Sequence, residues 1–342
     1  MKNGKIAAIL FAVLLLLVLG RYWPQPAQKP PAAKNPPAVP GPAFGAINVP
    51  LAVLWSEPGI KRDYDGLILG AATNPSAWAG GMDAEKRLWL VNKVETQAIF
   101  GERVAVLDRQ GDWLKVAAVS QRTSRNEMGY PGWLPAAQVK YNESYLGEQL
   151  SLPEVVVSAP LARLFRDSDL GTVIVELSCQ TRLPLIAVEG QTFMVRLPDG
   201  SAGYLAPGEA KRAGELVFSE AGAVEEARQF LGLPYLWGGT SSYGFDCSGF
   251  TFRILQSQGL SIPRDADEQA REGVPVVKEN LRPGDLLFFA AKEGRGQIHH
   301  VGIYSGGGRM VHAPDSSSSV REEEYDAGAY GEEYWGARRY AP

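Results

Sequence analysis

The chain has 342 residues, enough for two or three domains of about 100–150 residues each. It is 45% hydrophobic and 21% charged, an ordinary globular composition that excludes a wholly disordered or fibrous protein. The 34 Lys and Arg against 38 Asp and Glu give a formal charge of −4, whereas a general nucleic-acid binder normally carries a basic excess. Two cysteines are too few for a disulfide scaffold or a multi-cysteine zinc site.

The amino-terminal end predicts export. Residues 6–19 form the apolar run IAAILFAVLLLLVL after Lys2 and Lys5, which is typical of a secretory signal. Fourteen helical residues span about 21 Å, less than the ~30 Å hydrocarbon core of a membrane. The basic and aromatic residues 21–23 could instead anchor an uncleaved helix at the membrane interface. Cleavage and anchoring both stay open.

A proline-rich segment follows. Eight of residues 24–42 are proline, which predicts an extended spacer. We therefore interpret residues 1–20 as a signal peptide or membrane anchor and residues 21–45 as a linker. Both indicate an exported, extracytoplasmic protein.

From residue 49 to residue 211 the sequence consists of short β-segments separated by turn residues. Residues 74–91, NPSAWAGGMDAEKRLWLV, are an exception and predict a helical insertion. We divide this part into two β-domains, residues 46–145 and 150–212. The expected strands include Arg103–Leu107, Trp113–Val119, Gly132–Leu134, Thr172–Leu177, Phe193–Leu197 and Gly203–Leu205.

The two β-domains contain a weak internal repeat. ERVAVLDRQGDWLKV and PGWLPAAQV in the first match TRLPLIAVEGQTFMV and SAGYLAPGEA in the second, so Gly111 corresponds to Gly190 at an offset of 79 residues. This order of strand, glycine turn and strand resembles the bacterial SH3-like wall-binding module. The second copy departs from it, with Thr192 in place of Trp113. Two roles stay open for Trp113 and Trp133: binding of a ligand in the first copy, or filling of the core of a small barrel.

After residue 214 helices come first and strands later, which indicates an α+β domain over residues 218–342. Apolar residues at helical spacing predict a first helix over Val217–Leu231 and a second from about Cys247 to Gln258. The expected strands are Asp285–Ala290, Ile298–Tyr304 and Arg309–Ala313.

Cys247 is the candidate nucleophile. It lies in FDCSGFTFRIL, where Asp246 is the expected cap and the sulfur belongs to the first turn of a helix. The unpaired N–H groups and positive dipole end there favour thiolate and can hold an oxyanion. A nearby imidazole would accept and later donate a proton. Cys179, in the apolar run VIVELSC with no histidine near it, is interpreted as a structural residue.

All three histidines, His299, His300 and His312, lie in the last 44 residues. Neighbours on a strand point to opposite faces, so His299 and His300 cannot both face the cysteine. A three-residue hairpin centred on Gly306 would place His300 directly opposite His312, with Gly302 leaving space beside the imidazole. A loop of even length would place His299 there instead, so this argument leaves the choice open.

Metal and disulfide chemistry fit the sequence less well. His-His-x11-His with one cysteine lacks a familiar zinc-ligand spacing, and we expect neither a metal nor another cofactor. We also do not expect a disulfide between Cys179 and Cys247.

Five ordered motifs now point to a known family. They are PYLWGG at 234–239, FDCSGF at 245–250, RPGDL at 282–286, HVGIY at 300–304 and HA at 312–313. Together they resemble the NlpC-like cysteine peptidases of bacterial cell walls. The resemblance covers about residues 218–342. It implies a papain-like core with Cys247 as nucleophile, His300 as base and His312 as the orienting residue.

The arrangement of two SH3-like modules, the helical insertion and the stretch RNEMGYPGW at 125–133 looks more narrowly like the γ-D-glutamyl-L-diamino acid peptidases. These cut muropeptides between D-glutamate and lysine or diaminopimelate. By this similarity Tyr130, Trp237, Asp246 and Ser248 would line the substrate end. Helix capping by Asp246 and Ser248, and packing by Tyr130 and Trp237, are the alternatives.

We therefore expect an α+β protein in which a papain-like cysteine peptidase domain follows two small SH3-like β-barrels. The expected partners are peptidoglycan stem peptides with a free N-terminal L-Ala, from which a monomeric enzyme would release L-Ala-D-Glu. A general cell-wall endopeptidase, an amidase or an acyltransferase of the same superfamily stays open. A non-catalytic wall-binding protein is disfavoured, since a binder needs no paired cysteine and histidine.

Overall fold

The structure is a computed structural model that describes residues 43–340. The predictions of a signal peptide or anchor and of a proline-rich linker fall on residues outside this range. Within it, no helix combines the length and the apolar character needed to cross a membrane.

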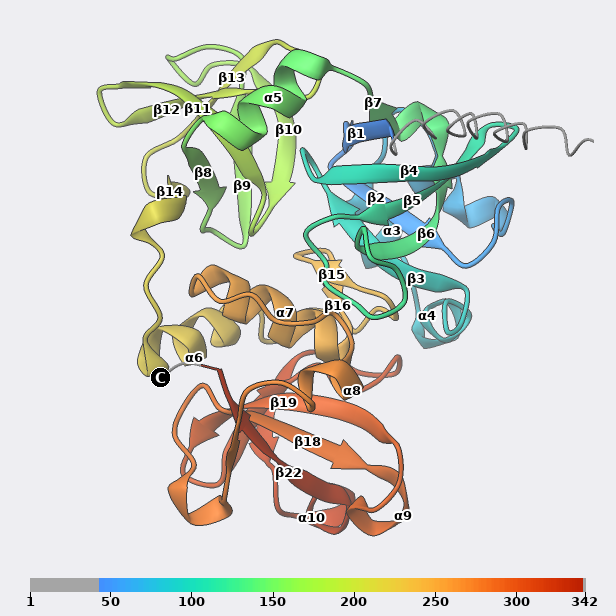
Figure 1. Cartoon of the computed structure of the whole chain (residues 1–342), viewed down its shortest axis with the longest axis vertical. Coiled ribbons are helices and arrows are strands. Elements are labelled where there is room, and N and C mark those ends of the chain that lie inside the picture. The colour runs from blue at the N-terminus through green and yellow to red at the C-terminus, as the bar shows by residue number, and fades with distance from the viewer. Residues whose placement is uncertain (1–42, 341–342) are drawn as a thin grey trace, which may run out of the picture. The chain divides into compact units, whose positions relative to one another are not determined.

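The first β-domain is a seven-stranded antiparallel sheet in the order β3-β2-β6-β5-β4-β1-β7 (Figure 1). Its strands are β1 (Ala43–Ile47), β2 (Leu51–Trp55), β3 (Val94–Ile99), β4 (Arg103–Gln110), β5 (Trp113–Ala118), β6 (Tyr130–Pro135) and β7 (Val139–Lys140).

The predicted helical insertion is confirmed between β2 and β3. It consists of η2 (Asp63–Asp65), α2 (Gly66–Leu69), α3 (Pro75–Gly80) and α4 (Ala84–Leu88). The side chains of Asn74 and Asp83 cap the N-termini of α3 and α4.

The second β-domain follows α5 (Glu143–Ser151) and repeats the first, with the order β10-β9-β13-β12-β11-β8-β14. Its strands are β8 (Glu154–Val157), β9 (Leu161–Phe165), β10 (Val173–Ser178), β11 (Arg182–Glu189), β12 (Thr192–Arg196), β13 (Ala202–Leu205) and β14 (Ala210–Arg212). Gly111 and Gly190 turn the corresponding hairpins with φ of 58° and 64°, a conformation that favours glycine. The matching strand orders confirm the internal repeat.

The carboxyl-terminal domain has the expected α+β architecture, built on a sheet in the order β17-β22-β18-β19-β20-β21. Its strands are β17 (Val274–Val276), β18 (Leu286–Ala290), β19 (Ile298–Gly306), β20 (Arg309–His312), β21 (Arg321–Glu324) and β22 (Tyr334–Arg339), besides the short hairpin β15 (Thr240–Ser241) and β16 (Gly244–Phe245). Its helices are α6 (Glu220–Arg228), α7 (Cys247–Ser257), α8 (Ala266–Gln269), α9 (Ala291–Gly294) and α10 (Gly328–Glu333). Phe250 and Ile254 of α7 share one hydrophobic core with Val301 and Ile303 of β19, which fixes the helix against the sheet.

The β19–β20 hairpin differs in register from the prediction. Tyr304 pairs with Met310 and Gly306 with Arg309, so the turn has two residues rather than three. A two-residue turn alone would place His300 and His312 on opposite faces. A β-bulge between Tyr304 and Gly306 adds one residue and restores the shared face. The expected loop and direct pairing were therefore wrong, but the shared face of the two histidines is confirmed.

Both β-domains hold the β15–β16 hairpin that leads into Cys247. From the first domain, the Gln97 side chain accepts a hydrogen bond from the Thr240 N–H at 3.0 Å, and the Gln97 carbonyl accepts one from the Thr240 hydroxyl at 3.0 Å. From the second domain, the Ser178 hydroxyl accepts from the Ser242 N–H at 2.9 Å. These buried contacts fix the chain directly before the candidate nucleophile.

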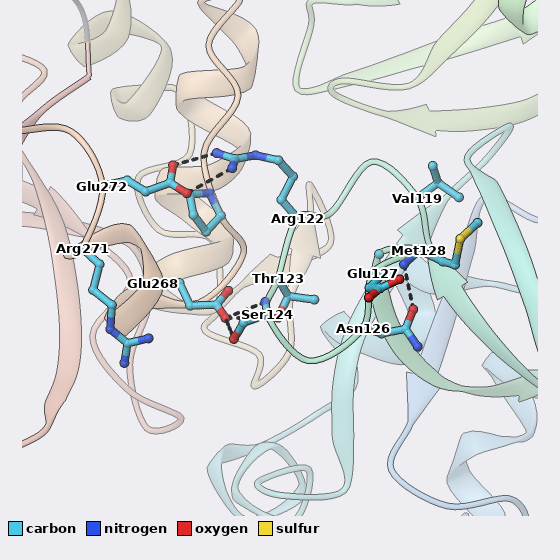
Figure 2. Close-up of a pocket in the computed structure, with 12 residues that line it drawn as sticks. Val119, Arg122, Thr123, Ser124, Asn126, Glu127, Met128, Glu268, Arg271 and Glu272 are labelled. Atoms are coloured by element: carbon cyan, nitrogen blue, oxygen red, sulfur yellow. Dashed lines mark hydrogen bonds and ion pairs between the residues drawn. The ribbon is translucent and has the colours of Figure 1, made fainter.

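A loop of the first β-domain also holds the segment around α8 (Figure 2). Arg122 forms a two-pronged ion pair with Glu272 at 2.8 and 3.0 Å, and the Ser124 N–H donates to Glu268 at 2.8 Å. A cavity of about 590 Å³ lies between this loop and α8. The first β-domain is thus joined to the peptidase domain on both sides of Arg264 and Asp265.

Candidate active site

Cys247 is the first residue of α7, as the sequence predicted. The Asp246 side chain caps the helix by accepting a hydrogen bond from the Gly249 N–H at 2.7 Å. The backbone N–H groups of Ser248 and Val301 face the sulfur and favour the thiolate. The candidate nucleophile therefore lies between the start of α7 and Val301 in the middle of β19.

Burial nevertheless raises the pKa of the Cys247 thiol to about 12, with the negative charge of Asp246 as the next cause. Burial also holds the pKa of His300 well below its usual range. The expectation of a resting thiolate at the helix start is therefore not met. Desolvation outweighs the helix N–H groups, so the neutral forms of the Cys247 thiol and of the His300 imidazole are both favoured.

The two histidines of the predicted triad contact each other. His300 Nε2 and His312 Nδ1 are 2.7 Å apart, and both side chains are buried. Burial lowers the pKa of His312 to about 3. The other ring nitrogen of His312, Nε2, lies 2.7 Å from Glu323 Oε1. His299 is exposed instead, with Nε2 3.1 Å from the Glu333 carboxylate.

We expect His300→Ala to lower kcat/KM by at least ~100-fold, since a general base contributes about 10²–10⁴-fold. His299→Ala, the matched control one residue away, should stay within a few-fold of wild type because its ring is exposed. The measurement is kcat/KM of both variants on one γ-D-glutamyl peptide. A greater loss in His299→Ala would contradict the assignment of the base.

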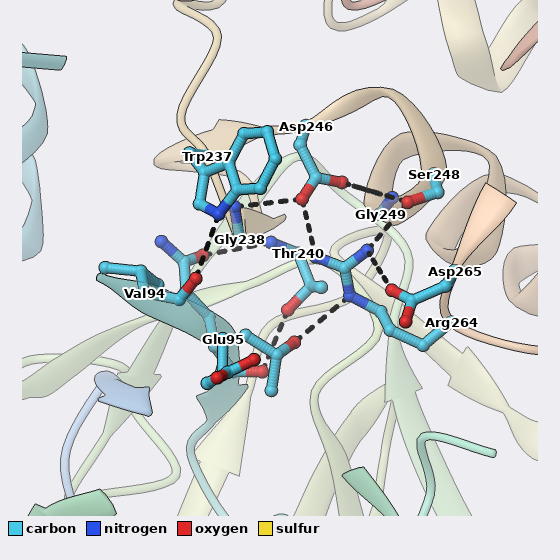
Figure 3. Close-up of polar contacts among 12 residues, drawn as sticks. Val94, Glu95, Trp237, Gly238, Thr240, Asp246, Ser248, Gly249, Arg264 and Asp265 are labelled. Atoms are coloured by element: carbon cyan, nitrogen blue, oxygen red, sulfur yellow. Dashed lines mark hydrogen bonds and ion pairs between the residues drawn. The ribbon is translucent and has the colours of Figure 1, made fainter. Parts of the chain in front are cut away.

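A cleft of about 800 Å³ opens in front of Cys247. Residues from the first β-domain and from the peptidase domain line it together (Figure 3). The first domain contributes Asn92, Val94, Glu95 and Arg125. The peptidase domain contributes Tyr235, Trp237, Asp246, Cys247, Ser248, Arg264, Asp265, Ala266, Asp267, Ala291, Gln297, Ile298 and the exposed His299.

Three of the four predicted substrate residues line this cleft. Trp237 donates its indole N–H to the Val94 carbonyl at 3.0 Å. Asp246 and Ser248 are already engaged, since Arg264 donates to both at 2.7 and 2.9 Å. Capping and packing are therefore present alongside any role in binding.

Tyr130 lies behind the cleft rather than on its surface. The residue is buried, and its hydroxyl donates to the Asp265 carboxylate at 3.0 Å while accepting from Arg125 at 2.7 Å. Burial raises the pKa of Tyr130, so the hydroxyl keeps its proton at neutral pH. Any influence of Tyr130 on a substrate would pass through Asp265 or Arg125.

Sequence reasoning missed the charged residues of the cleft, above all Arg264. This guanidinium is buried and also donates to Thr96 of the first β-domain at 3.1 Å. Removing one member of such a buried pair typically costs about 3–5 kcal/mol, because the partner is left unpaired. Arg264 and Asp265 stand in the segment SIPRDADEQA, which has no periodicity or motif that would have singled them out.

The other predicted features can be placed as well. Cys179 and Cys247 are both free, and burial raises the pKa of the Cys179 thiol to about 11. Trp113 and Trp133 are half-buried and pack against the core beside the helical insertion. Among residues 43–340, no three or more His, Cys, Asp or Glu side chains are grouped as metal ligands.

Comparison with known proteins identifies the family of this chain. The NlpC/P60 family profile matches residues 232–339, and the YKFC SH3b2 domain profile matches residues 157–211. A Bacillus cereus protein named gamma-D-glutamyl-L-lysine dipeptidyl-peptidase is 42% identical over 86% of this chain and 90% of its own length. The chain belongs to the NlpC/P60 family.

Two further similarities support this membership. A Bacillus subtilis protein, also named gamma-D-glutamyl-L-lysine dipeptidyl-peptidase, is 39% identical over 79% of this chain and 90% of its own length. The crystal structure of an NlpC/P60 family protein from Bacillus cereus superposes with a TM-score of 0.84 at 40% identity, covering 88% of this chain and 100% of that one. The expected fold, a papain-like NlpC/P60 cysteine peptidase domain after two SH3-like domains, is confirmed.

Proposed function

We propose that this NlpC/P60 peptidase hydrolyses the γ-D-glutamyl-L-diamino acid bond of peptidoglycan stem peptides. The support is twofold. Relatives at 39–42% identity, aligned over most of both chains, carry the name gamma-D-glutamyl-L-lysine dipeptidyl-peptidase. In addition, Cys247 and the buried pair His300 and His312 supply the chemistry of a cysteine peptidase.

The reaction follows from these groups. His300 takes the proton from the Cys247 thiol, and the sulfur attacks the γ-carbonyl carbon of D-glutamate. Backbone N–H groups at the start of α7 stabilise the negative charge on the carbonyl oxygen. The imidazolium then donates its proton to the leaving α-amine of the diamino acid. Water, activated by the same imidazole, hydrolyses the thioester and frees the cysteine.

The position of the first β-domain at the cleft favours a short substrate. It contributes Glu95 and Arg125 to the wall of the cleft that contains Cys247. Because the first β-domain forms one wall of the cleft, the cleft suits the free end of a peptide better than the middle of a long peptidoglycan chain. The acidic groups Glu95 and Asp265 lie in that part of the cleft and suit an ammonium group. We infer that the amino-terminal L-Ala binds there and that the product is L-Ala-D-Glu.

We also infer where the enzyme acts. Peptidoglycan lies outside the cytoplasmic membrane, and the apolar run at residues 6–19 is typical of an export signal. An extracytoplasmic monomer, either secreted or held by an uncleaved anchor, is the form that we propose.

Incubation of the full-length protein with L-Ala-γ-D-Glu-L-Lys and with its diaminopimelate counterpart tests the proposal. We expect mass spectrometry to detect L-Ala-D-Glu and the free diamino acid from one or both peptides. The α-linked isomer L-Ala-α-D-Glu-L-Lys is the matched control and should stay intact, since its scissile carbonyl is displaced from the nucleophile. Cleavage of the control alone, or of neither γ-linked peptide, would contradict this function.

A further inference from the structure

A carboxylate extends the contact between His300 and His312 by one further side chain. Glu323 Oε1 lies 2.7 Å from His312 Nε2, and His312 Nδ1 lies 2.7 Å from His300 Nε2. Arg321 donates to the same Glu323 oxygen at 2.8 Å and holds it in place. The strand register brings these groups together: Arg321 on β21 pairs with His312 on β20, so Glu323 points to the same face of the sheet.

These contacts determine which ring nitrogen of His300 and of His312 carries a proton. An ionised carboxylate can only accept, so Nε2 of His312 must carry the hydrogen that lies between them. His312 is neutral at physiological pH, since burial lowers its pKa to about 3, and its Nδ1 is therefore a bare acceptor. His300 must then donate from Nε2, and its own Nδ1 is the bare nitrogen.

We propose that Glu323 is a positioning residue that selects the reactive tautomer of His300. It acts through His312 and never touches the substrate. With Nδ1 of His300 unprotonated, the proton of the Cys247 thiol moves to that nitrogen: the S–H bond breaks, the N–H bond forms, and the sulfur electron pair attacks the carbonyl. The Glu323 charge stabilises the resulting imidazolium without accepting a proton itself. The proposed peptidase function gives the tautomer its use, but the tautomer can be measured without it.

Other charged or titratable groups also face the histidine pair. The ring of Tyr330 from α10 packs at 5.5 Å from His300 and 5.2 Å from His312, measured between ring centroids. The remaining groups with an electrostatic effect on the pair are His299 on β19, Asp315 after β20 and Arg321 on β21. Glu323 is the acidic group in hydrogen-bond contact with either imidazole among the described residues.

Nitrogen NMR of the wild-type protein tests the tautomer directly. The chain has only three histidines, so ¹⁵N-histidine labelling gives three pairs of ring signals, and His299→Gln removes the exposed one. We expect both His300 and His312 to carry their proton on Nε2 at neutral pH. A proton on Nδ1 of His312 would overturn the proposal whether or not the enzyme is active on γ-D-glutamyl peptides.

Variants of β21 provide the kinetic test. Glu323→Leu removes acceptor and charge, whereas Glu323→Gln keeps an acceptor oxygen. We expect Glu323→Leu to lower kcat by at least ~10-fold with little change in KM, because proton transfer is impaired when His300 adopts the wrong tautomer. Gln should recover part of that loss. The exposed neighbour Glu324→Gln is the matched control and should keep wild-type kcat.

The pH profile distinguishes a positioning role of Glu323 from a general structural effect of its replacement. A nearby carboxylate raises the pKa of an imidazolium, so removing its charge lowers that pKa. The acidic limb of kcat/KM, set by protonation of His300, should therefore move to lower pH in both Glu323 variants and stay in place in Glu324→Gln. An unchanged limb together with wild-type kcat would refute the role of Glu323.

Discussion

Replacing Cys247 by alanine should abolish hydrolysis, with kcat lowered by at least ~10⁴-fold, since loss of a nucleophile typically costs this much or more. The fold should survive. The side chain that caps α7 belongs to Asp246, and the helix is held through Phe250 and Ile254. Circular dichroism and thermal unfolding should therefore match the wild type. Cys247→Ser should behave alike, because a hydroxyl beside a neutral imidazole is a far weaker nucleophile than a thiol.

The second cysteine provides the control within the same chain. Cys179 is buried in the second β-domain, where its backbone N–H donates to the Ser242 hydroxyl at 3.1 Å. Its thiol lies near the Ser178 and Ser242 hydroxyl groups, which can also receive a serine side chain. Cys179→Ser should keep most of the activity. Normal turnover by Cys247→Ala would exclude the proposed mechanism.

A free amino terminus on the substrate should accelerate cleavage by at least ~100-fold over the same peptide acylated on L-Ala, which corresponds to about 2.7 kcal/mol. The cleft next to Cys247 contains Glu95 and Asp265, and Tyr130 donates to Asp265 at 3.0 Å. A charge-assisted hydrogen bond from an ammonium to such groups is worth about 1.5–3 kcal/mol. Acylation removes the positive charge of the ammonium group and with it this charge-assisted contact.

Turnover on matched free and N-acetylated L-Ala-γ-D-Glu-L-Lys measures this preference. We include Tyr130→Phe, which removes the hydroxyl that holds the Asp265 carboxylate in place, and Asp246→Asn, which removes the negative charge beside Cys247. Both should reduce the ratio of the two rates. Asp246→Asn should also destabilise the fold, since Arg264 would lose its buried counterion. Equal rates of the wild type on both peptides would favour a general cell-wall endopeptidase.

The local sequence already placed Cys247, the proposed nucleophile, at the start of a helix, because helix starts obey short-range rules. A capping side chain must lie within three residues of the N–H that it accepts from, so FDCSG was sufficient to place Cys247. The pKa of that thiol could not be predicted in the same way. It depends on how completely β19 and the first β-domain remove water from the start of α7, and desolvation outweighed the helix N–H groups.

The β19–β20 hairpin could be predicted from the sequence only in part. Alternation along a strand limited the base to His299 or His300, whereas the register depended on a bulge that a glycine-rich loop does not reveal. The turn is one residue shorter than expected, and the bulge adds one residue back. These two differences cancel, so His300 and His312 still share one face. Glu323 could not be found at all, since its place beside His312 requires the pairing of β20 with β21.

The sequence alone revealed what is local or periodic: the globular composition, the repeated β-domains, the α+β order of the last domain and the motifs around Cys247, His300 and His312. The contacts between distant groups became visible only in the fold. Arg264 donates to Thr96 because the first β-domain packs onto the peptidase domain. Such contacts depend on domain packing, which brings together side chains separated by more than a hundred residues and leaves no period or spacing in the sequence.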